Sequence, residues 1–600
     1  MKYYCNPLNV NYRYQFNADP RLHGKLQICR EAADPSMICF RGRYYIFASM
    51  TLGVWVSEDL VQWENHRLPQ ELPLYDYAPD VRVLGDWVYF CASNRERNCD
   101  RWRTKDVLKG PYEKLEGSFP FWDPNLFADD DGRVYFYWGC SNVTPIWGVE
   151  LDPETMLPKT EPKALIEGHP FEIGYERVGE NNSLLPASEE EVEAKYQGFL
   201  AHSKAPESAL TPALKSVIRG MFTRRPYIEG AWMDKHDGKY YLQYAAPGTQ
   251  YNSYSDGVYV GESPLGPFRL AENNPYSYKP GGFLPGAGHG STMEDRQGNL
   301  WHSATMRISV NHDFERRVGL WPAGFDAEGE LFCNQRYGDW PMALSGGRED
   351  PWRNPPWMLL SAGKAASASS WVPGHEPEKA AEENVQSWWQ AASNRREEWL
   401  QLDLGREFDV RAVQINFADG RLDLPCPGEI RPGSQARYIE EAELVTRWKL
   451  EGSLDGESWF TVEDKSEADT DLSHDLIVRE AGFRARYLRL GNMALPYGQA
   501  PCVSGLRVFG LGEGPRPQVP EFTASRDNEL DMTVGIQPQE NALGWNILFG
   551  SSPEKLYHSA MVFAPGSQRI GALIRDREYW VRVDAFNESG ITEGRCVKLN

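Results

Sequence analysis

One arrangement of residues occurs five times between residues 30 and 330. A polar residue is followed by an apolar strand, a tight turn with glycine or aspartate, and a second strand rich in aromatic side chains. Glycine supplies the positive φ angle that such turns need, so each copy predicts a β-hairpin. The copies are ADPSMICFRGRYYIFAS (33–49), APDVRVLGDWVYFCAS (78–93), WDPNLFADDDGRVYFYWG (122–139), IEGAWMDKHDGKYYLQYAA (228–246) and GHGSTMEDRQGNLWHSAT (288–305).

Repeats of this irregular spacing are typical of propeller blades. The innermost strand of each blade lines a central axis, so we expect the polar residues that open the copies to meet there. The long interval between the third and fourth copies has a helical pattern and predicts an insertion at about residues 175–222. The opening residues are Asp34, Asp80, Asp123, Glu229 and His289.

Over about residues 5 to 345 the chain resembles glycoside hydrolase family 43, the five-bladed β-propeller glycosidases. ADPS is similar to the family segment with the general base, which implies that role for Asp34. DPNLFADDDGRVY implies that Asp123 tunes and orients the acid. IEGAW implies that Glu229 is the general acid, although Ala231 stands where the family usually has proline.

Two further segments extend this resemblance. GHGSTMEDRQGNLW is similar to the segment whose histidine lies at the axis, often near a bound calcium, which implies a metal role for His289, directly or through water. ERRVGLWPAGFDAEGEL resembles the segment with a pocket arginine; Arg316 fits its spacing best, and Arg317 is the alternative. The resemblance implies no cofactor for the chemistry, and calcium would be structural.

The implied chemistry is hydrolysis of a glycosidic bond with inversion. Such enzymes use one protonated and one ionised carboxyl group, roughly 6.5–9.5 Å apart, with a water between the base and the sugar. We expect Asp34 to take a proton from this water. Glu229 needs a raised pKa to remain protonated, and a nearby ionised Asp123 would raise it.

Several aromatic residues near the opening positions are candidates for stacking on a sugar ring. The alternative is that they pack between blades, as strand aromatics commonly do. Asp80, in the tetrad YAPD, is predicted to bind substrate instead of taking part in the chemistry. The aromatic candidates are Trp55, Tyr77, Trp122 and Trp232.

The rest of the chain has a different character. Residues 346–359 are rich in proline, glycine and charge and predict a linker. Residues 360–514 resemble discoidin-like domains, which are β-sandwiches of the jelly-roll kind that include many carbohydrate-binding modules; the motifs are EEWLQLDLG, LEGSLDGESWF, RARYLRL and SGLRVFG. This region is interpreted either as a sugar-binding module, with contacts in the loop 417–434, or as a structural support.

Residues 515–600 resemble a fibronectin type III domain, with Leu573 six residues before Tyr579, the spacing of a tyrosine corner.

Composition restricts the partners. The formal net charge of −22 argues against nucleic acid, because phosphate binding relies on clusters of Lys and Arg. No stretch of about 18 apolar residues predicts a membrane span. The ten cysteines form no C-x-x-C pair, and the first residues lack the apolar core of a signal peptide. We expect a cytoplasmic protein with reduced thiols, or a secreted one if a leader has been removed; no pattern indicates an oligomeric state.

The expected protein is an all-β, exo-acting glycosidase that removes terminal pentoses from plant oligosaccharides. α-L-Arabinofuranosidase and β-D-xylosidase activities fit the resemblance best. One alternative is a β-galactosidase that acts on galactan side chains. Another is a carbohydrate-binding propeller without activity, which the presence of all three carboxylates disfavours.

Overall fold

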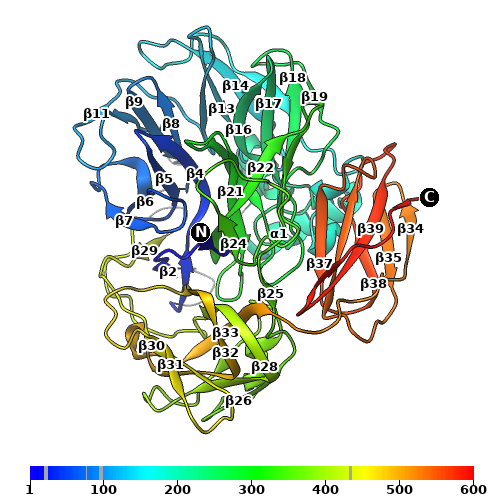
Figure 1. Ribbon diagram of the computed structural model, residues 1–600. Coiled ribbons are helices and arrows are strands. Elements are labelled where there is room, and N and C mark those ends of the chain that lie inside the picture. Colours follow the sequence, from blue (N-terminus) through cyan, green and yellow to red (C-terminus); the bar gives the residue numbers. More distant parts are fainter. Residues whose placement is uncertain (19–23, 76, 94–98, 204–205, 432–435) are drawn as a thin grey trace.

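The computed structural model describes residues 1–18, 24–75, 77–93, 99–203, 206–431 and 436–600, and it is almost entirely β (Figure 1). Five four-stranded antiparallel sheets follow one another along the first half of the chain. The first two consist of β4 (Ala33–Phe40), β5 (Arg43–Ser49), β6 (Gly53–Ser57) and β7 (Glu64–Arg67), and of β8 (Tyr77–Leu84), β9 (Trp87–Ser93), β10 (Arg101–Thr104) and β11 (Tyr112–Lys114). The third consists of β12 (Asn125–Ala128), β13 (Val134–Trp138), β14 (Ile146–Leu151) and β15 (Lys163–Ile166). The last two consist of β16 (Glu229–His236), β17 (Lys239–Ala246), β18 (Ser255–Gly261) and β19 (Phe268–Leu270), and of β20 (Gly288–Glu294), β21 (Leu300–Arg307), β22 (Arg316–Phe325) and β23 (Leu331–Cys333).

The first strands of these sheets form a closed ring. β4 contacts β8, β8 contacts β12, β12 contacts β16, β16 contacts β20, and β20 contacts β4 again. The five predicted hairpins are the pairs β4–β5, β8–β9, β12–β13, β16–β17 and β20–β21. The residues that open the hairpins therefore surround one axis.

Four of the inner strands are fastened to the next by the side chains that stand two positions after Asp34, Ala78, Asp123 and His289. The side-chain oxygens of Ser36, Asp80, Asn125 and Ser291 each accept a hydrogen bond from a backbone N–H of the next inner strand. The fourth sheet has Trp232 at this position, and an indole offers no acceptor. These buried bonds satisfy backbone groups that face the axis, where pairing within a sheet cannot reach them.

The predicted insertion contains two helices, α1 (Glu189–Ser203) and α2 (Pro212–Gly220). Ser188 begins α1 with a capping box, because its hydroxyl accepts from the N–H of Glu191, whose carboxylate accepts from the N–H of Ser188. Thr211 caps α2 in the same position, and Pro212 follows at its first turn. Residues 204 and 205 of the insertion lie outside the described residues. The short 3-10 helices are Pro73–Tyr75, Gly174–Glu176, Glu180–Asn182, Glu207–Ala209, Pro377–Ala381 and Pro496–Gly498.

A small antiparallel sheet joins the N-terminus to the second half of the chain. β29 (Arg437–Ile439) pairs with β2 (Arg13–Ala18), which pairs with β3 (Leu26–Glu31). β1 (Lys2–Tyr4) pairs with β24 (Met342–Leu344). Residues that are far apart in the sequence therefore lie side by side beneath the ring (Figure 1).

Eight strands within residues 358–511 form one antiparallel sheet with a core around Trp389 and Trp448, and β29 lies outside it. The predicted linker 346–359 is shorter than expected, because its last two residues are the strand β25, paired with β33. Part of the predicted sugar-contact loop, residues 432–434, lies outside the described residues. The strands are β25 (Met358–Leu359), β26 (Ala365–Ala368), β27 (Trp389–Gln390), β28 (Leu400–Phe417), β30 (Arg447–Ser453), β31 (Phe460–Asp464), β32 (His474–Ala494) and β33 (Cys502–Leu511).

Residues 522–598 form two further sheets at the side of the ring (Figure 1). One has the order β34–β35–β38, and the other has the order β37–β36–β39–β40 with β41 also on β39. Their strands are β34 (Phe522–Asn528), β35 (Asp531–Ile536), β36 (Gly544–Gly550), β37 (His558–Val562), β38 (Gly566–Ile570), β39 (Trp580–Asn587), β40 (Gly590–Thr592) and β41 (Val597–Lys598).

Two features of the chain concern its helices and its cysteines. Among the described residues, no helix combines the length and the apolar character that a membrane span requires. All ten cysteines lie in the described part of the chain, and each is a free thiol.

Candidate active site

A residue in the left-handed backbone region lies within two positions of the first residue of each inner strand. The φ angles lie between 49° and 61°, at Asp34, Ala78, Asp123, Gly230 and His289. In four of the five sheets the pairing with the second strand shifts at this point, which is a β-bulge. A bulge re-aims side chains that would otherwise alternate between the faces of a strand.

The residues at these bulges line one cavity of about 270 Å³ at the axis. Each of the five sheets supplies either the left-handed residue or the one before it. The lining residues are Asp34, Tyr77, Trp122, Asp123, Cys140, Tyr227, Glu229, Gly248, Thr249, Gln250, His289, Asp313, Phe314 and Arg316.

Hydroxyl groups from the second strands hold three of the left-handed residues in place. In each case the hydroxyl oxygen accepts a hydrogen bond from the backbone N–H of a left-handed residue in the next sheet around the ring. The bonds run from Ala78 to Ser49 at 2.7 Å, from Asp123 to Ser93 at 2.8 Å and from Asp34 to Thr305 at 2.9 Å. The geometry of the site therefore depends on contacts between neighbouring sheets.

Asp34 is a buried carboxylate surrounded by donors. The Ser49 hydroxyl donates to its Oδ2 at 2.5 Å, and the Arg316 guanidinium donates to its Oδ1 at 3.2 Å. Nδ1 of His289 lies 3.5 Å from Oδ1. Burial raises the pKa of Asp34, but Arg316, His289 and the hydroxyls of Ser49 and Thr305 outweigh this effect, so the pKa lies below its usual value. Asp34 is therefore ionised near neutral pH.

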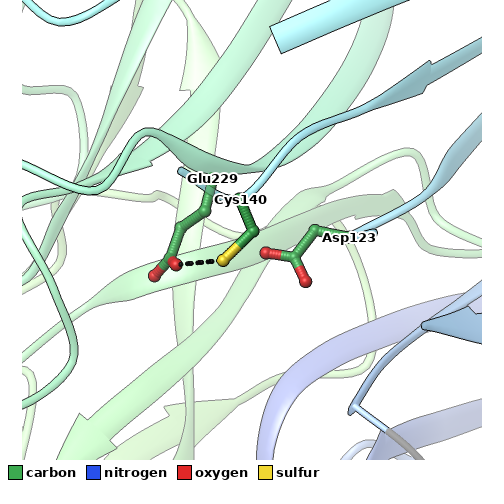
Figure 2. Close-up of side chains that lie close together, drawn as sticks. All are labelled: Asp123, Cys140 and Glu229. Atoms are coloured by element: carbon green, nitrogen blue, oxygen red, sulfur yellow. Dashed lines mark hydrogen bonds between the residues drawn. The ribbon is translucent and has the colours of Figure 1, made fainter. Parts of the chain in front are cut away.

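Glu229 lies beside the Cys140 thiol and a second carboxylate, Asp123 (Figure 2), and it also bonds to Tyr254. The Tyr254 hydroxyl donates to its Oε1 at 2.5 Å, and the Cys140 thiol donates to its Oε2 at 3.1 Å. One ligand-type atom each of Asp123, Cys140 and Glu229 lies within 4.8 Å of the other two. The two carboxyl groups are thus close enough to influence each other's charge.

His289 lies between the carboxylates. Its Nδ1 is 3.5 Å from Asp34 and 3.7 Å from Asp123. Burial lowers the pKa of His289, but Asp34, Asp123 and Glu229 outweigh this effect and hold the pKa above its usual value. The imidazolium form therefore neutralises part of the negative charge at the axis.

The surroundings of His289 do not fit a directly bound calcium. Calcium takes six to eight oxygen ligands, whereas His289 presents a ring nitrogen. The Asp34 oxygen nearest to it already accepts from Arg316. The close cluster of possible ligands contains the thiol of Cys140, which prefers softer metals.

Arg316 is the arginine of the cavity. It bridges Asp34 and Glu31, to which its Nε donates at 3.1 Å. Arg317 instead points into the interior, where it donates to His474 at 2.8 Å. The spacing that favoured Arg316 therefore identified the residue at the cavity.

Two of the four aromatic candidates line the cavity, and two do not. Tyr77 and Trp122 directly precede left-handed residues and face the cavity. Trp55 packs in the core between the first and last sheets, and its indole N–H donates to Asn11 at 2.7 Å. The Trp232 ring lies under the guanidinium of Arg82, 3.7 Å from the ring centre. Trp55 and Trp232 are corrected here to packing residues.

Asp80 is also corrected, because it does not line the cavity. The left-handed residue of the second sheet is Ala78, two positions earlier. Asp80 accepts from the N–H of Leu126 at 2.7 Å and from the amide of Asn125 at 3.0 Å. It therefore fastens two inner strands together, as Ser36 does elsewhere in the ring.

Several cavity residues were missed by the sequence analysis. Cys140 follows the end of the second strand of its sheet, near the position at which Ser49 and Ser93 act elsewhere, and this repeat was a usable signal. Phe314 and Gln250 lie in loops between strands. Their approach to the axis depends on how these loops pack, which no local pattern indicates.

The first half of the chain is similar in sequence to known proteins. Residues 28–179 and 184–331 match glycosyl hydrolases family 43, which is half of the chain. Xylosidase/arabinosidase 43A of Humicola insolens is 27% identical over 363 residues, covering 53% of this chain and 96% of that protein. Beta-xylosidase of Xylanibacter ruminicola is 26% identical over 167 residues, covering 27% of this chain and 44% of that protein. A thermostable family-43 glycoside hydrolase of known structure has a TM-score of 0.39 at 21% identity, covering 58% of this chain and 100% of that chain. By its sequence match, the chain belongs to glycosyl hydrolases family 43.

Proposed function

We propose that this family 43 glycoside hydrolase is an inverting, exo-acting enzyme that removes terminal pentoses from oligosaccharides. It would act as an α-L-arabinofuranosidase, a β-D-xylosidase or both. The observation that carries the proposal is the meeting of Asp34, Asp123 and Glu229 in one cavity with His289 and Arg316. The names of the Humicola insolens and Xylanibacter ruminicola relatives support pentosides as the substrate class.

We assign Asp34 the role of general base. Its lowered pKa supplies an ionised carboxylate, and three donors fix its orientation. A water between Asp34 and the sugar attacks the anomeric carbon and gives its proton to Asp34. Arg316 keeps the carboxylate anionic until that transfer.

We assign Glu229 the role of general acid. Its proton passes to the glycosidic oxygen while the bond from the anomeric carbon to that oxygen breaks. Tyr254 and Cys140 hold the carboxyl group from two sides. Asp123 is assigned the modulating role, since like charges so close together oppose each other.

The cavity also supports removal of single terminal sugars. Its volume of about 270 Å³ and its aromatic walls suit one ring stacked on Tyr77, Trp122 or Phe314. The partner is therefore an oligosaccharide or polysaccharide end.

We interpret the ring as a five-bladed β-propeller within residues 1–345. The sheet of residues 358–511 supports a discoidin-like sandwich within 360–514. For the fibronectin type III-like domain at 515–600, the support is the Tyr579 hydroxyl, which accepts from the N–H of Ile574 at 2.9 Å as in a tyrosine corner.

The test is hydrolysis of nitrophenyl α-L-arabinofuranoside, β-D-xyloside and β-D-galactoside by wild type, Asp34→Asn and Glu229→Gln. The control is Asp152→Asn, because Asp152 accepts from backbone N–H groups in an exposed turn far from the site. We expect pentoside cleavage that both site variants lose and the control keeps. Cleavage of the galactoside alone would favour a galactosidase. Activity that survives Asp34→Asn would refute the assigned base.

No cofactor is proposed for this chemistry. Dialysis against a chelator should leave kcat on the preferred glycoside unchanged, because His289 presents a nitrogen, a poor calcium ligand, and the Asp34 oxygen nearest to it already accepts from Arg316. The measurement is kcat before and after chelation, with Mg²⁺ and Ca²⁺ added back separately. Loss of activity that only Ca²⁺ restores would contradict the expectation and support the axial calcium that the family resemblance implies.

A further inference from the structure

A short strand from the second half of the chain reaches the floor of the active site. β29 follows the long loop after β28 and adds to the edge of β2 beside the ring (Figure 1). Its register pairs Gln15 with Ile439 and Asn17 with Arg437. The strand thereby carries one cation, Arg437, into the interior beneath the cavity.

Arg437 is buried and bonded to residues of the ring half. Its side chain is 6% exposed. Nη1 donates to Oε2 of Glu31 at 2.9 Å and to Oε1 of Gln15 at 2.5 Å. Nη2 donates to the hydroxyl of Tyr77, a cavity residue.

Glu31 links Arg437 to the catalytic carboxylate. One of its oxygens accepts from Arg437, and the other accepts from Arg316, which also donates to Asp34 at 3.2 Å. Glu31 is fully buried and Arg316 is 4% exposed. Two cations and two carboxylates therefore alternate in one line from β29 to Asp34.

The same two arginines flank Tyr77. The guanidinium carbons of Arg316 and Arg437 lie 5.6 Å and 5.0 Å from the centre of its ring. Loss of Arg437 would remove both the donor to the Tyr77 hydroxyl and one partner of Glu31. A buried carboxylate that loses one cation draws more strongly on the other, so Arg316 would turn from Asp34 toward Glu31.

We propose that Arg437 is a positioning residue of the active site, which acts through Glu31 and Arg316 on Asp34 and directly on Tyr77. The region of residues 358–511 is then a required part of the catalytic centre instead of a detachable sugar-binding module. The inference rests on the proposed function, because it takes Asp34 as the base.

A purely structural role is the competing explanation, since other arginines cross the same interface. Arg13, on β2, donates to Glu443 at 2.7 Å and to the carbonyl of Glu440 at 3.2 Å. Its side chain is 7% exposed, and it has no hydrogen bond to a cavity residue within the described chain. Arg13 therefore matches Arg437 in burial and in the parts of the chain that it joins, but not in its link to Asp34.

The experiment compares Arg437→Met, Arg437→Lys and Arg13→Met in the full chain. For each variant we would measure Tm, kcat, KM and the pH profile of kcat/KM on the glycoside that wild type prefers. We expect Arg437→Met to lower kcat about tenfold or more, because small displacements of reacting groups are costly. The acidic limb should also move to higher pH by about one unit, since Asp34 loses part of its cationic partner. Arg13→Met should lower Tm and leave both quantities near wild type.

Arg437→Lys keeps a positive charge near Glu31, but its side chain cannot bond to both Glu31 and Tyr77. Compared with Arg437→Met, it should bring the acidic limb of kcat/KM closer to that of wild type than it brings kcat. If Arg437→Met does not fold, Arg437→Lys and Tyr77→Phe still test the proposal, because both should lower kcat. If Arg437→Met and Arg13→Met have the same kcat and the same acidic limb of kcat/KM, the proposal that Arg437 positions the active site is refuted. Asp34→Asn runs alongside: if that variant stays active, the proposed function fails, whereas an inactive Asp34→Asn with an unaffected Arg437→Met refutes only this inference.

Discussion

At the scale of single residues, the site depends on hydroxyl groups with two tasks. The Ser49 oxygen accepts from the N–H of Ala78 and donates its proton to Asp34 at 2.5 Å. One serine thus fixes a bulge in the second sheet and helps to keep the carboxylate of the first sheet ionised.

Ser49→Ala should therefore move the acidic limb of kcat/KM to higher pH. The lost hydrogen bond favours the ionised form of Asp34, so its removal raises the pKa of that carboxyl, and the base is protonated at a higher pH than in wild type. The shift should be smaller than that of Arg316→Met, which removes a full charge. The control is Ser303→Ala, because the buried Ser303 hydroxyl donates to the carbonyl of Gly319. An acidic limb of kcat/KM at the same pH in Ser49→Ala and wild type would contradict the expectation.

Cys140 gives a second residue-scale prediction. Its thiol lines the cavity and donates to Glu229. Alkylation with iodoacetamide should abolish activity, since the added group fills the space beside the acid, and bound pentose should slow the reaction. Cys140→Ser should keep a donor and resist the reagent. Cys596→Ser, which changes an exposed thiol far from the site, should remain as sensitive as wild type. Equal inactivation of Cys140→Ser would refute the prediction.

Much of the site was predictable from the sequence. Asp34, Asp123 and His289 open their copies of the repeat at the left-handed position, and Glu229 lies directly before it. Asp80 was not separable from them by pattern, because a carboxylate looks the same at the opening of a strand and two residues later. Only the backbone conformation at Ala78 decides between these positions.

At the scale of the elements, the fastening bonds between inner strands explain why the ring holds its shape. Ser36, Asp80, Asn125 and Ser291 repeat one function with different side chains. Any side chain of about the right length with an acceptor oxygen can make such a bond, so no one residue type repeats at this position. The sequence periodicity therefore predicts the hairpins but not these bonds. The hairpins were predictable since turn residues and aromatic strands are local signals.

Asp80→Ala should destabilise the protein by about 1–3 kcal/mol, because it leaves the buried N–H of Leu126 without its acceptor. Asp80→Asn should destabilise the protein less than Asp80→Ala does and should keep kcat and KM.

Burial raises the pKa of Asp80 to about 6, despite opposing effects of Arg82 and the hydrogen bonds. The folded state therefore holds this proton more tightly than the unfolded state, and wild type should lose stability as the pH rises from about 4 to about 6. Asp80→Asn lacks this contribution.

Thermal unfolding at several pH values tests both statements. The difference in Tm between wild type and Asp80→Asn isolates the titration of this one group. As the pH rises from about 4 to about 6, we expect the Tm of wild type to fall relative to the Tm of Asp80→Asn. A constant difference would show that Asp80 does not titrate there, and an increase in KM would restore it as a substrate-binding residue.

At the scale of the whole molecule, the three parts of the chain share their interiors. One apolar cluster combines Tyr175 and Tyr244 of the ring half with Trp545, Phe549 and Leu573 of the C-terminal sheets. The linker and the changes in composition predicted separate domains, but the sequence contained no signal for how they dock. Docking depends on surfaces whose partners are hundreds of residues away.

The segment that joins the C-terminal sheets to the ring also supports the cavity. Arg177 donates to Asp531 at 2.5 Å within this contact. In the same segment Glu180 accepts from Arg307, which also donates to the carbonyl of the cavity residue Gln250 at 2.6 Å. The short backbone segment 177–180 therefore joins a contact with the C-terminal sheets to a contact with one wall of the sugar cavity.

Arg177→Met should loosen that wall. Arg177→Met removes one of two cations from Asp531, which keeps Arg569 at 2.6 Å. We therefore expect a cost of about 1.5–3 kcal/mol, that of a lost hydrogen bond to a charged group. We expect a lower Tm and a KM raised several-fold, with kcat changed less, since Gln250 lines the cavity but lies outside the acid–base pair. The control is Arg582→Met, because Arg582 pairs with Asp584 and Glu593 within the C-terminal sheets, and no hydrogen bond joins it to a cavity residue in the described chain. Comparable losses of Tm with a raised KM only in Arg177→Met would show that the C-terminal sheets shape the substrate site, whereas an unchanged KM in both would limit them to stability.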